Sequence, residues 1–263
     1  MQNSTWLSSR ISTFICRILI ASVIGFLFIS TAIPSHAETD ETLLSLPDDP
    51  TQEKLHDGPP LTPERAALLA QFQEPNLTPQ QIAEILSQYK FVDPQHVIPQ
   101  ALLNRALVYF DVNKNLISNQ HCLSVVNFSE ESRKVRFHII NMTTGEVVSI
   151  RVAHGIGSDP KNTGYAVQFG NTPESHMSSL GIYLTAETYK GENGDIRCRL
   201  DGLSKTNSNV RDRNIVIHGA DYVEDANIKP GRSWGCLATS RENHERVVNE
   251  LKEGSIIFAG TTK

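Results

Sequence analysis

The sequence predicts a strand-rich α+β protein. Beyond residue 119, short runs of β-favouring residues follow one another, and only one clear helical segment interrupts them. A doubly wound parallel sheet would alternate its strands with long helices, so the pattern argues against that fold and for a β-rich α+β domain. The strand-like runs cover residues 122–128, 135–140, 147–152, 180–185, 214–218 and 255–259.

Composition agrees with a globular chain. The 263 residues are 39% hydrophobic and 20% charged, which excludes a disordered chain, a collagen-like repeat and a polytopic membrane protein. One or two domains fit this length. The net charge of −5 lacks the basic surplus of nucleic-acid-binding proteins, so no nucleic-acid partner is expected.

The N-terminus has the pattern of an export signal. Arg10 and Arg17 precede an uncharged, mostly apolar stretch over residues 18–33, and Ser35-His36-Ala37 forms a small-x-small cleavage pattern. Cleavage is the favoured interpretation. An uncleaved anchor is the alternative, because flanking residues can extend a stretch that is slightly short for a membrane span. Either way, residues 38–263 are expected in the periplasm or cell envelope, with membrane contact only through an uncleaved signal.

The chain divides into four predicted parts: a signal over residues 1–37, a linker over 38–61, a helical region over 62–118 and a strand-rich domain over 119–263. The linker is acidic and rich in proline, without a hydrophobic period.

Helix signals are clear on both sides of the strands. Thr62-Pro63 and Thr78-Pro79 each combine a hydroxyl N-cap with proline at the first helical position, and Gln81 completes a capping box. A third helix is expected from Pro99. Late in the chain, Ser240 is expected to cap a helix that ends before Gly254. Its core-facing side chains should be Val247, Val248 and Leu251.

The number of cysteines indicates that at least one thiol stays unpaired. Without Cys16 of the signal, the exported chain carries Cys122, Cys198 and Cys236, and this odd number leaves at least one thiol unpaired. Such a thiol either bridges to another chain or reacts. Cys122 and Cys198 are expected on strands, as buried thiols or, less favoured, as a disulfide. No CxxC, HxxxH or HExxH spacing occurs, so no metal site is predicted.

His218 and Cys236 are the candidate catalytic residues. An apolar strand ends in His218-Gly219, and Ser233-Trp234-Gly235-Cys236 follows. A free thiol is mostly protonated at neutral pH, so a nucleophilic cysteine needs a base such as histidine. The Gly219 carbonyl can fix the imidazole tautomer, and the amides of Gly235 and Cys236 can converge on an oxyanion. From residue types alone, a structural Cys and His remain the alternative.

These segments resemble the L,D-transpeptidase (YkuD-type) family, and most closely its murein L,D-transpeptidase catalytic-domain branch. The family pattern is His-Gly, a loop, and then [S/T]-x-G-C, which residues 218–219 and 233–236 match. Similar blocks span about residues 122–260, and they are 127–129, 153–158, 178–183, 199–203 and 217–223. The resemblance implies a catalytic domain of mixed and antiparallel strands behind the helical region.

The resemblance also implies a cysteine acyltransferase that acts on peptidoglycan tetrapeptide stems. Cys236 would attack the carbonyl between the L-centre of meso-diaminopimelate and the terminal D-Ala, release D-Ala and leave a thioester. A second stem would then give a 3–3 crosslink, a free D-amino acid would give exchange, and water would give trimming. His218 would move the protons, while the amides of Trp234, Gly235 and Cys236 would hold the oxyanion, supported by Gly219 and Ser233. No cofactor is implied, and carbapenems are the expected acylating inhibitors.

Other side chains have weaker signals. Arg213 and Arg232 flank the two catalytic segments and are candidates for binding a stem carboxylate, with solvated surface arginines as the alternative. Tyr183 and Tyr189 are candidates for lining a groove, or are core aromatics. His154 is a candidate second imidazole of the site, or is structural.

Two other functions stay open. An L,D-carboxypeptidase would use the same thiol, and a non-catalytic wall-binding scaffold would keep only the fold. The intact His218 and Cys236 pair argues against the scaffold. Leu237 departs from the proline that this branch often has after Gly-Cys, which is expected to loosen the loop that holds the nucleophile.

Overall fold

The computed structural model describes residue 48, residues 59–191 and residues 194–262. The chain divides into two units, Met1–Asp40 and Glu41–Lys263, and every described residue belongs to the second unit. The predicted signal over residues 1–37 and most of the predicted linker lie outside the described residues.

One eight-stranded sheet organises the described residues, with the strand order β3-β2-β1-β8-β4-β5-β6-β7. The neighbours β1 and β8 run parallel, as do β6 and β7, and the other five pairs are antiparallel. The strands are β1 (Cys122–Asn127), β2 (Phe137–Asn141), β3 (Val147–Ile150), β4 (Gly181–Lys190), β5 (Ile196–Gly202), β6 (Val216–Ala220), β7 (Leu237–Ser240) and β8 (Ile256–Gly260). The predicted β-rich α+β fold is confirmed.

Four α-helices accompany the sheet in the described part of the chain: α1 (Pro63–Leu69), α2 (Pro79–Gln88), α3 (Gln100–Val112) and α4 (Arg241–Leu251). The hydroxyls of Thr62 and Thr78 accept hydrogen bonds from the first-turn amides of α1 and α2, and the capping box with Gln81 is present. These two helices therefore begin where the sequence predicted. Short 3₁₀ turns lie at Lys114–Leu116, Ile156–Ser158 and Lys205–Asn207.

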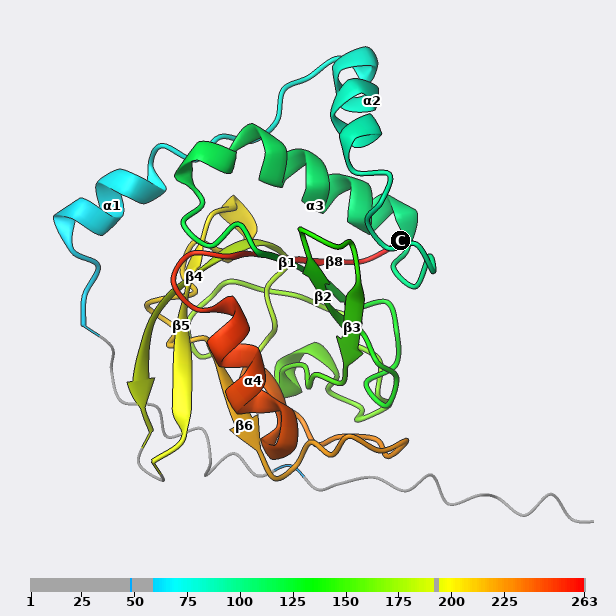
Figure 1. Cartoon of the computed structure of the whole chain (residues 1–263). Coiled ribbons are helices and arrows are strands. Elements are labelled where there is room, and N and C mark those ends of the chain that lie inside the picture. Colours follow the sequence, from blue (N-terminus) through cyan, green and yellow to red (C-terminus); the bar gives the residue numbers. More distant parts are fainter. Residues whose placement is uncertain (1–47, 49–58, 192–193, 263) are drawn as a thin grey trace, which may run out of the picture. The chain divides into compact units, whose positions relative to one another are not determined.

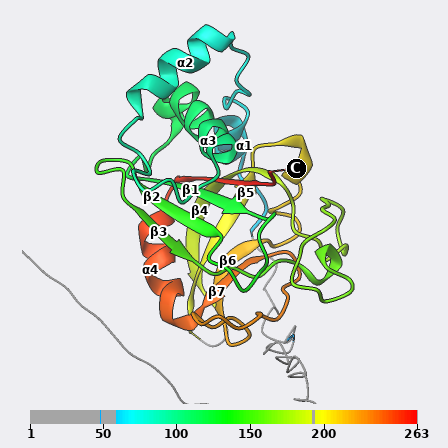
Figure 2. The same cartoon turned by 90° about the vertical axis from the view of Figure 1, so that its right-hand side faces the viewer.

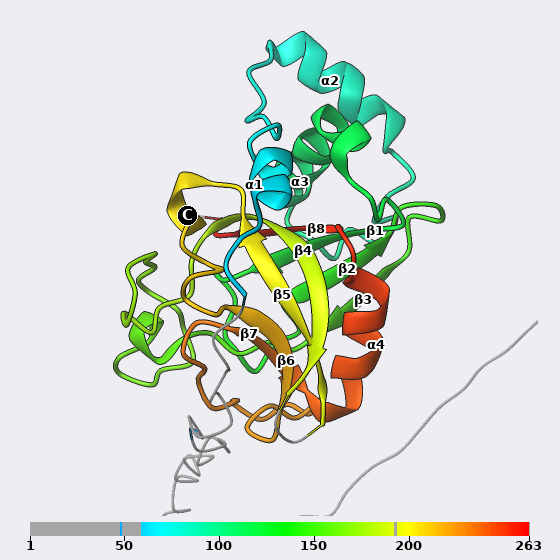
Figure 3. The same ribbon diagram turned by 90° about the vertical axis from the view of Figure 1, so that its left-hand side faces the viewer.

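The helices α3 and α4 cover different parts of the sheet. α3 packs against β1 and β8 in one apolar cluster, which includes Leu103, Phe110 and Phe258 (Figure 1). α4 packs against β5, β6 and β7 (Figure 3). Its predicted core-facing residues Val247, Val248 and Leu251 are buried. Burial of each such side chain stabilises the fold by about 1.5–3 kcal/mol.

The turn between β2 and β3 is the predicted hairpin. The Asn141 side chain accepts hydrogen bonds from the amides of Thr143 and Thr144, and Gly145 adopts a φ of +80° that favours glycine. β2 and β3 form one edge of the sheet, and β7 forms the other. The helices α1 to α3 lie at the end of this unit away from β6 and β7 (Figure 2), so the segments predicted to be catalytic gather apart from the helical region.

Candidate active site

The parallel pair of β6 and β7 brings the two predicted catalytic segments together. Ile217 pairs with Leu237 and His218 with Ala238. Cys236 directly precedes β7 and lies beside the start of β6, where its Sγ is 3.7 Å from the Asn214 carbonyl oxygen. His218 and Cys236 are both buried, at 0% and 1% exposure. Residues 18 positions apart in the chain are thus brought together at the edge of the sheet, His218 on β6 and Cys236 directly before β7.

The tautomer of His218 follows from its backbone contact. Its Nδ1 lies 3.2 Å from the Gly219 carbonyl oxygen, which only accepts hydrogen bonds. Nδ1 therefore donates, and Nε2 carries the lone pair that can accept a proton.

Burial keeps the His218 imidazole neutral. Desolvation and, to a smaller extent, the positive charge of Arg197 on the neighbouring strand β5 lower the pKa of His218, the bond to Gly219 raises it, and the net result is a pKa of about 4. At neutral pH the imidazole therefore has no second proton. It is in the form that a general base must have at the start of a reaction.

Ser233 shapes the loop that carries the cysteine. Its hydroxyl accepts a hydrogen bond from the Gly235 amide at 3.0 Å and donates one to the Cys236 carbonyl at 2.9 Å. Gly235 has a φ of +114°, and a Cβ there would lie 2.7 Å from the Met177 carbonyl oxygen, so glycine is required on both counts. An oxyanion role for the Gly235 amide stays a prediction, and it requires this amide to leave or share its bond to Ser233.

The strand-like segment around His154 supports the same loop from the other side. The Ser233 amide donates to the His154 carbonyl at 2.9 Å, and the Ile156 amide donates to the Ser233 carbonyl at 2.7 Å. The side chain of His154 points into a buried cluster instead: its Nδ1 is 2.8 Å from a guanidinium nitrogen of Arg136, and its Nε2 is 3.4 Å from the Asp159 carboxylate. The backbone of His154 therefore supports the loop, while its imidazole is part of the buried cluster, which favours the structural alternative for this residue.

The two candidate arginines have different partners. Arg213 donates to the Met177 carbonyl at 2.6 Å and to the Ser179 hydroxyl at 2.8 Å, so it braces the segment that leads into β4. Arg232 instead binds a carboxylate, that of Asp48. Only Arg232 is therefore engaged with the kind of group that it was predicted to bind.

Tyr183 lies in the core. It is 1% exposed, and its hydroxyl donates to the Ser179 carbonyl at 2.6 Å. This burial favours the core alternative over a groove-lining role. A residue near the cysteine loop that the sequence did not indicate is His176, whose ring stacks on Trp234 with centroids 4.7 Å apart and planes 7° apart. Trp234 keeps 38% of its surface exposed, so the stack forms a solvent-facing rim beside the cysteine loop.

Cys122 and Cys198 are free thiols, Cys198 being buried and Cys122 partly buried. Burial raises the pKa of Cys122 to about 11 and that of Cys198 to about 12. Both are therefore protonated and unreactive at neutral pH, as expected of structural thiols.

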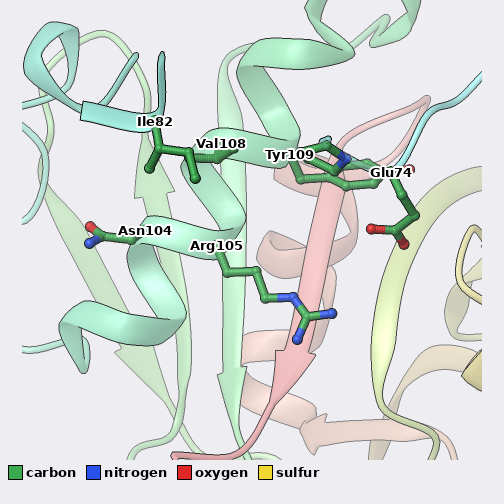
Figure 4. Close-up of a pocket in the computed structure, with 7 residues that line it drawn as sticks. Glu74, Ile82, Asn104, Arg105, Val108 and Tyr109 are labelled. Carbon is green, nitrogen blue, oxygen red and sulfur yellow. The ribbon is translucent and has the colours of Figure 1, made fainter. Parts of the chain in front are cut away.

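Some features lie apart from this site. A cavity of about 410 Å³ between α2 and α3, lined by Glu74, Ile82, Arg105 and their neighbours (Figure 4), contains none of the predicted catalytic residues. The described residues include no group of three or more His, Cys, Asp or Glu side chains placed to hold a metal ion. Within the same residues, no helix is long and apolar enough to cross a bilayer.

The chain belongs to the L,D-transpeptidase catalytic domain family, whose profile matches residues 94–259, more than half of its length. The matched region includes α3 and the sheet except for Gly260, the last residue of β8. The class of protein is therefore that of L,D-transpeptidase-type catalytic domains.

Solved structures of other proteins are similar to this chain. One is L,D-transpeptidase 1 of Mycobacterium tuberculosis, with 13% identity and a TM-score of 0.29 over 52% of this chain and 60% of that one. Another is Bd1075 of Bdellovibrio bacteriovorus, with 13% identity and a TM-score of 0.30 over 52% of this chain and 47% of that one. The alignments thus cover about half of each of these proteins or slightly more. No curated protein matches the chain.

Proposed function

We propose that this protein is a cysteine-dependent L,D-transpeptidase that processes peptidoglycan tetrapeptide stems through a thioester. The observation that supports this most is the parallel pair of β6 and β7, which places a buried, neutral His218 on the strand beside the Cys236 loop. The family membership supplies the substrate class.

The first half-reaction forms the acyl-enzyme. His218 takes the thiol proton of Cys236 on Nε2, and the sulfur attacks the carbonyl between diaminopimelate and D-Ala. Amides of the cysteine loop stabilise the negative charge that develops on the carbonyl oxygen. As the C–N bond breaks, His218 returns the proton to the leaving amine of D-Ala, and the thioester remains.

The second half-reaction resolves the thioester. The incoming amine of another stem attacks the same carbonyl, His218 accepts one of its protons, and the sulfur leaves as a thiol once that proton reaches it. The product is a 3–3 crosslink. A free D-amino acid as acceptor gives exchange of the terminal residue, and water gives the tripeptide product of an L,D-carboxypeptidase.

The fixed tautomer makes the direction of proton transfer specific. Because Nδ1 is held as a donor to Gly219, only Nε2 is able to shuttle protons, so no carboxylate is needed to orient the ring. Ser233 keeps the backbone at Cys236 in one conformation by bridging the Gly235 amide and the Cys236 carbonyl.

Purified tetrapeptide muropeptides incubated with the full chain test this function by mass spectrometry. A crosslinked dimer that has lost one D-Ala is the expected product. Tripeptide alone would identify a carboxypeptidase, and unchanged tetrapeptide would support a wall-binding scaffold instead. Cys236→Ala should form no product, while Cys198→Ala, which removes an equally buried thiol, should retain activity.

Export is a separate expectation. If residues 1–37 are a cleaved signal, N-terminal sequencing of the protein from its native host should begin near Glu38. A full-length chain in the membrane fraction would identify an anchor.

A further inference from the structure

Arg232 holds a carboxylate that comes from far away in the chain. Its backbone amide lies 2.6 Å from one oxygen of Asp48, its Nε lies 3.2 Å from the same oxygen, and its Nη2 lies 2.5 Å from the other. Asp48 precedes Arg232 by 184 residues. Two oxygens bound by a guanidinium fork and an amide are the arrangement that best recognises any carboxylate.

The fold fixes Arg232 independently of Asp48. Its remaining nitrogen, Nη1, donates to the Asp159 carbonyl. The Asp159 carboxylate does not compete for the guanidinium, because the amides of Thr163 and Gly164 bind it at 2.9 and 2.7 Å. The Arg232 side chain is 11% exposed and that of Asp48 is 21% exposed, so the carboxylate lies on the solvent side of a preformed receptor.

The receptor lies within reach of the reaction. Arg232 is four residues from Cys236, which limits their Cα separation to about 14 Å even for an extended backbone. An extended tetrapeptide has a similar length. A stem whose reacting carbonyl is at Cys236 can therefore place one of its own carboxylates at Arg232.

We propose that Arg232 and its amide form a carboxylate-binding subsite for the stem peptide, and that Asp48 occupies this subsite as an internal competitor. The identity of the incoming ligand rests on the proposed function. Because Asp48 belongs to the same chain as Arg232, this competition is intramolecular, and dilution of the protein does not weaken it. Substrate must displace Asp48, so the contact raises KM for the stem.

Kinetics on the full chain test the competition. Asp48→Asn should lower KM for a tetrapeptide stem by about 2- to 10-fold, which is the effect of removing a partly exposed ion pair. Asp49→Asn removes the same charge from the neighbouring residue and should leave KM unchanged. An unchanged KM in Asp48→Asn, or an equal decrease in Asp49→Asn, would overturn the proposal.

Amidated stems identify which carboxylate the subsite takes. If the gain from Asp48→Asn disappears when the side-chain carboxylate of diaminopimelate is amidated, that group binds Arg232. If the gain persists, another carboxylate of the stem binds there.

A binding experiment separates the subsite from the proposed function. In the full-length Asp48→Asn chain, titration with acetate should shift the NMR signal of Arg232 Nε–H saturably, at concentrations that leave the wild-type signal in place. Absence of a saturable shift would refute the subsite. If the wild type makes no product from any stem, the proposed function fails, and the acetate titration still decides whether Arg232 is a carboxylate receptor.

Discussion

The molecule contains two buried imidazoles that the sequence presents in the same way, each preceded by an apolar residue and followed by glycine. His154 is 1% exposed and His218 is 0% exposed. Burial lowers the pKa of each to about 4. Their hydrogen bonds differ: Nδ1 of His154 lies against a guanidinium, which only donates, whereas Nδ1 of His218 lies against a carbonyl, which only accepts.

The two rings are therefore opposite tautomers. In His154 the Nδ1 lone pair is engaged by Arg136, and the proton on Nε2 points towards Asp159. In His218 the proton lies on Nδ1 and the lone pair on Nε2. Burial alone does not make a histidine a base. The hydrogen-bond partner of Nδ1 decides whether a buried histidine has a structural role or can act as a base at Nε2.

The largest difference between the two histidines should appear in turnover. His218→Ala should lower kcat by about 100- to 10,000-fold, because positioned acid–base catalysis contributes an effect of that size. His154→Gln, which keeps a polar side chain near Arg136, should retain kcat within about 10-fold. Muropeptide turnover by both variants tests this ranking, and equal losses would remove the distinction between them.

For stability, the variant of His154 is the one expected to show a large effect. His154→Ala leaves the fully buried Arg136 without one of its partners, which should cost about 2–4 kcal/mol of unfolding free energy. Val152 and Glu130 carbonyls still bind this guanidinium, so folding should survive. Urea unfolding monitored by circular dichroism measures the loss. A His154→Ala variant as stable as wild type would show that the cluster is dispensable.

Acid should destabilise the protein through both histidines. Each pKa falls from 6.5 in the unfolded chain to about 4 in the folded one, so between these values the unfolded state binds more protons. The stabilisation is complete above pH 6.5 and is lost as the pH falls towards 4, with a slope of about 1.4 kcal/mol per pH unit for each histidine. In His154→Gln one contribution is absent, so the slope should be shallower. An identical slope would mean that His154 is charged in the folded protein.

The smallest effect concerns Arg197. Its charge lowers the pKa of His218, so Arg197→Gln should raise that pKa, while Arg197→Lys should leave it nearly unchanged. An NMR pH titration of the His218 ring measures both. A shift of equal size in the lysine variant would point to a structural change rather than to lost charge.

Local signals in the sequence predicted most elements of this fold. The capped helices, the hairpin at Gly145 and α4 depend on short-range chemistry, and their predicted positions are confirmed. Within β5 the sequence predicts a strand position only at Cys198. Arg197 and Arg199 are charged, and charged residues do not indicate a buried strand. Arg197 pairs with Asp195, and Arg199 packs over the Tyr189 ring, so both are satisfied by partners that no local pattern reveals.

The residues of the site also fall into those that local sequence predicts and those that it does not. His218, Cys236 and the glycines around them could be selected from residue types and spacing, because acyl transfer needs a thiol, a base and tight turns. The roles of Arg136 and His176 could not, since each depends on a partner distant in sequence. The strand pairing of β6 with β7 is likewise a long-range contact, and β7 has only four residues to signal it.

Acylation of the full chain by a carbapenem tests the central claim most directly. The strained lactam carbonyl should accept the Cys236 sulfur and remain attached as a slowly resolving thioester. Mass spectrometry should show one drug-sized addition, on the peptide that contains residues 233–237, absent in Cys236→Ala and retained in Cys198→Ala. An adduct on Cys122, on Cys198 or on a serine would contradict the assignment of Cys236 as the nucleophile.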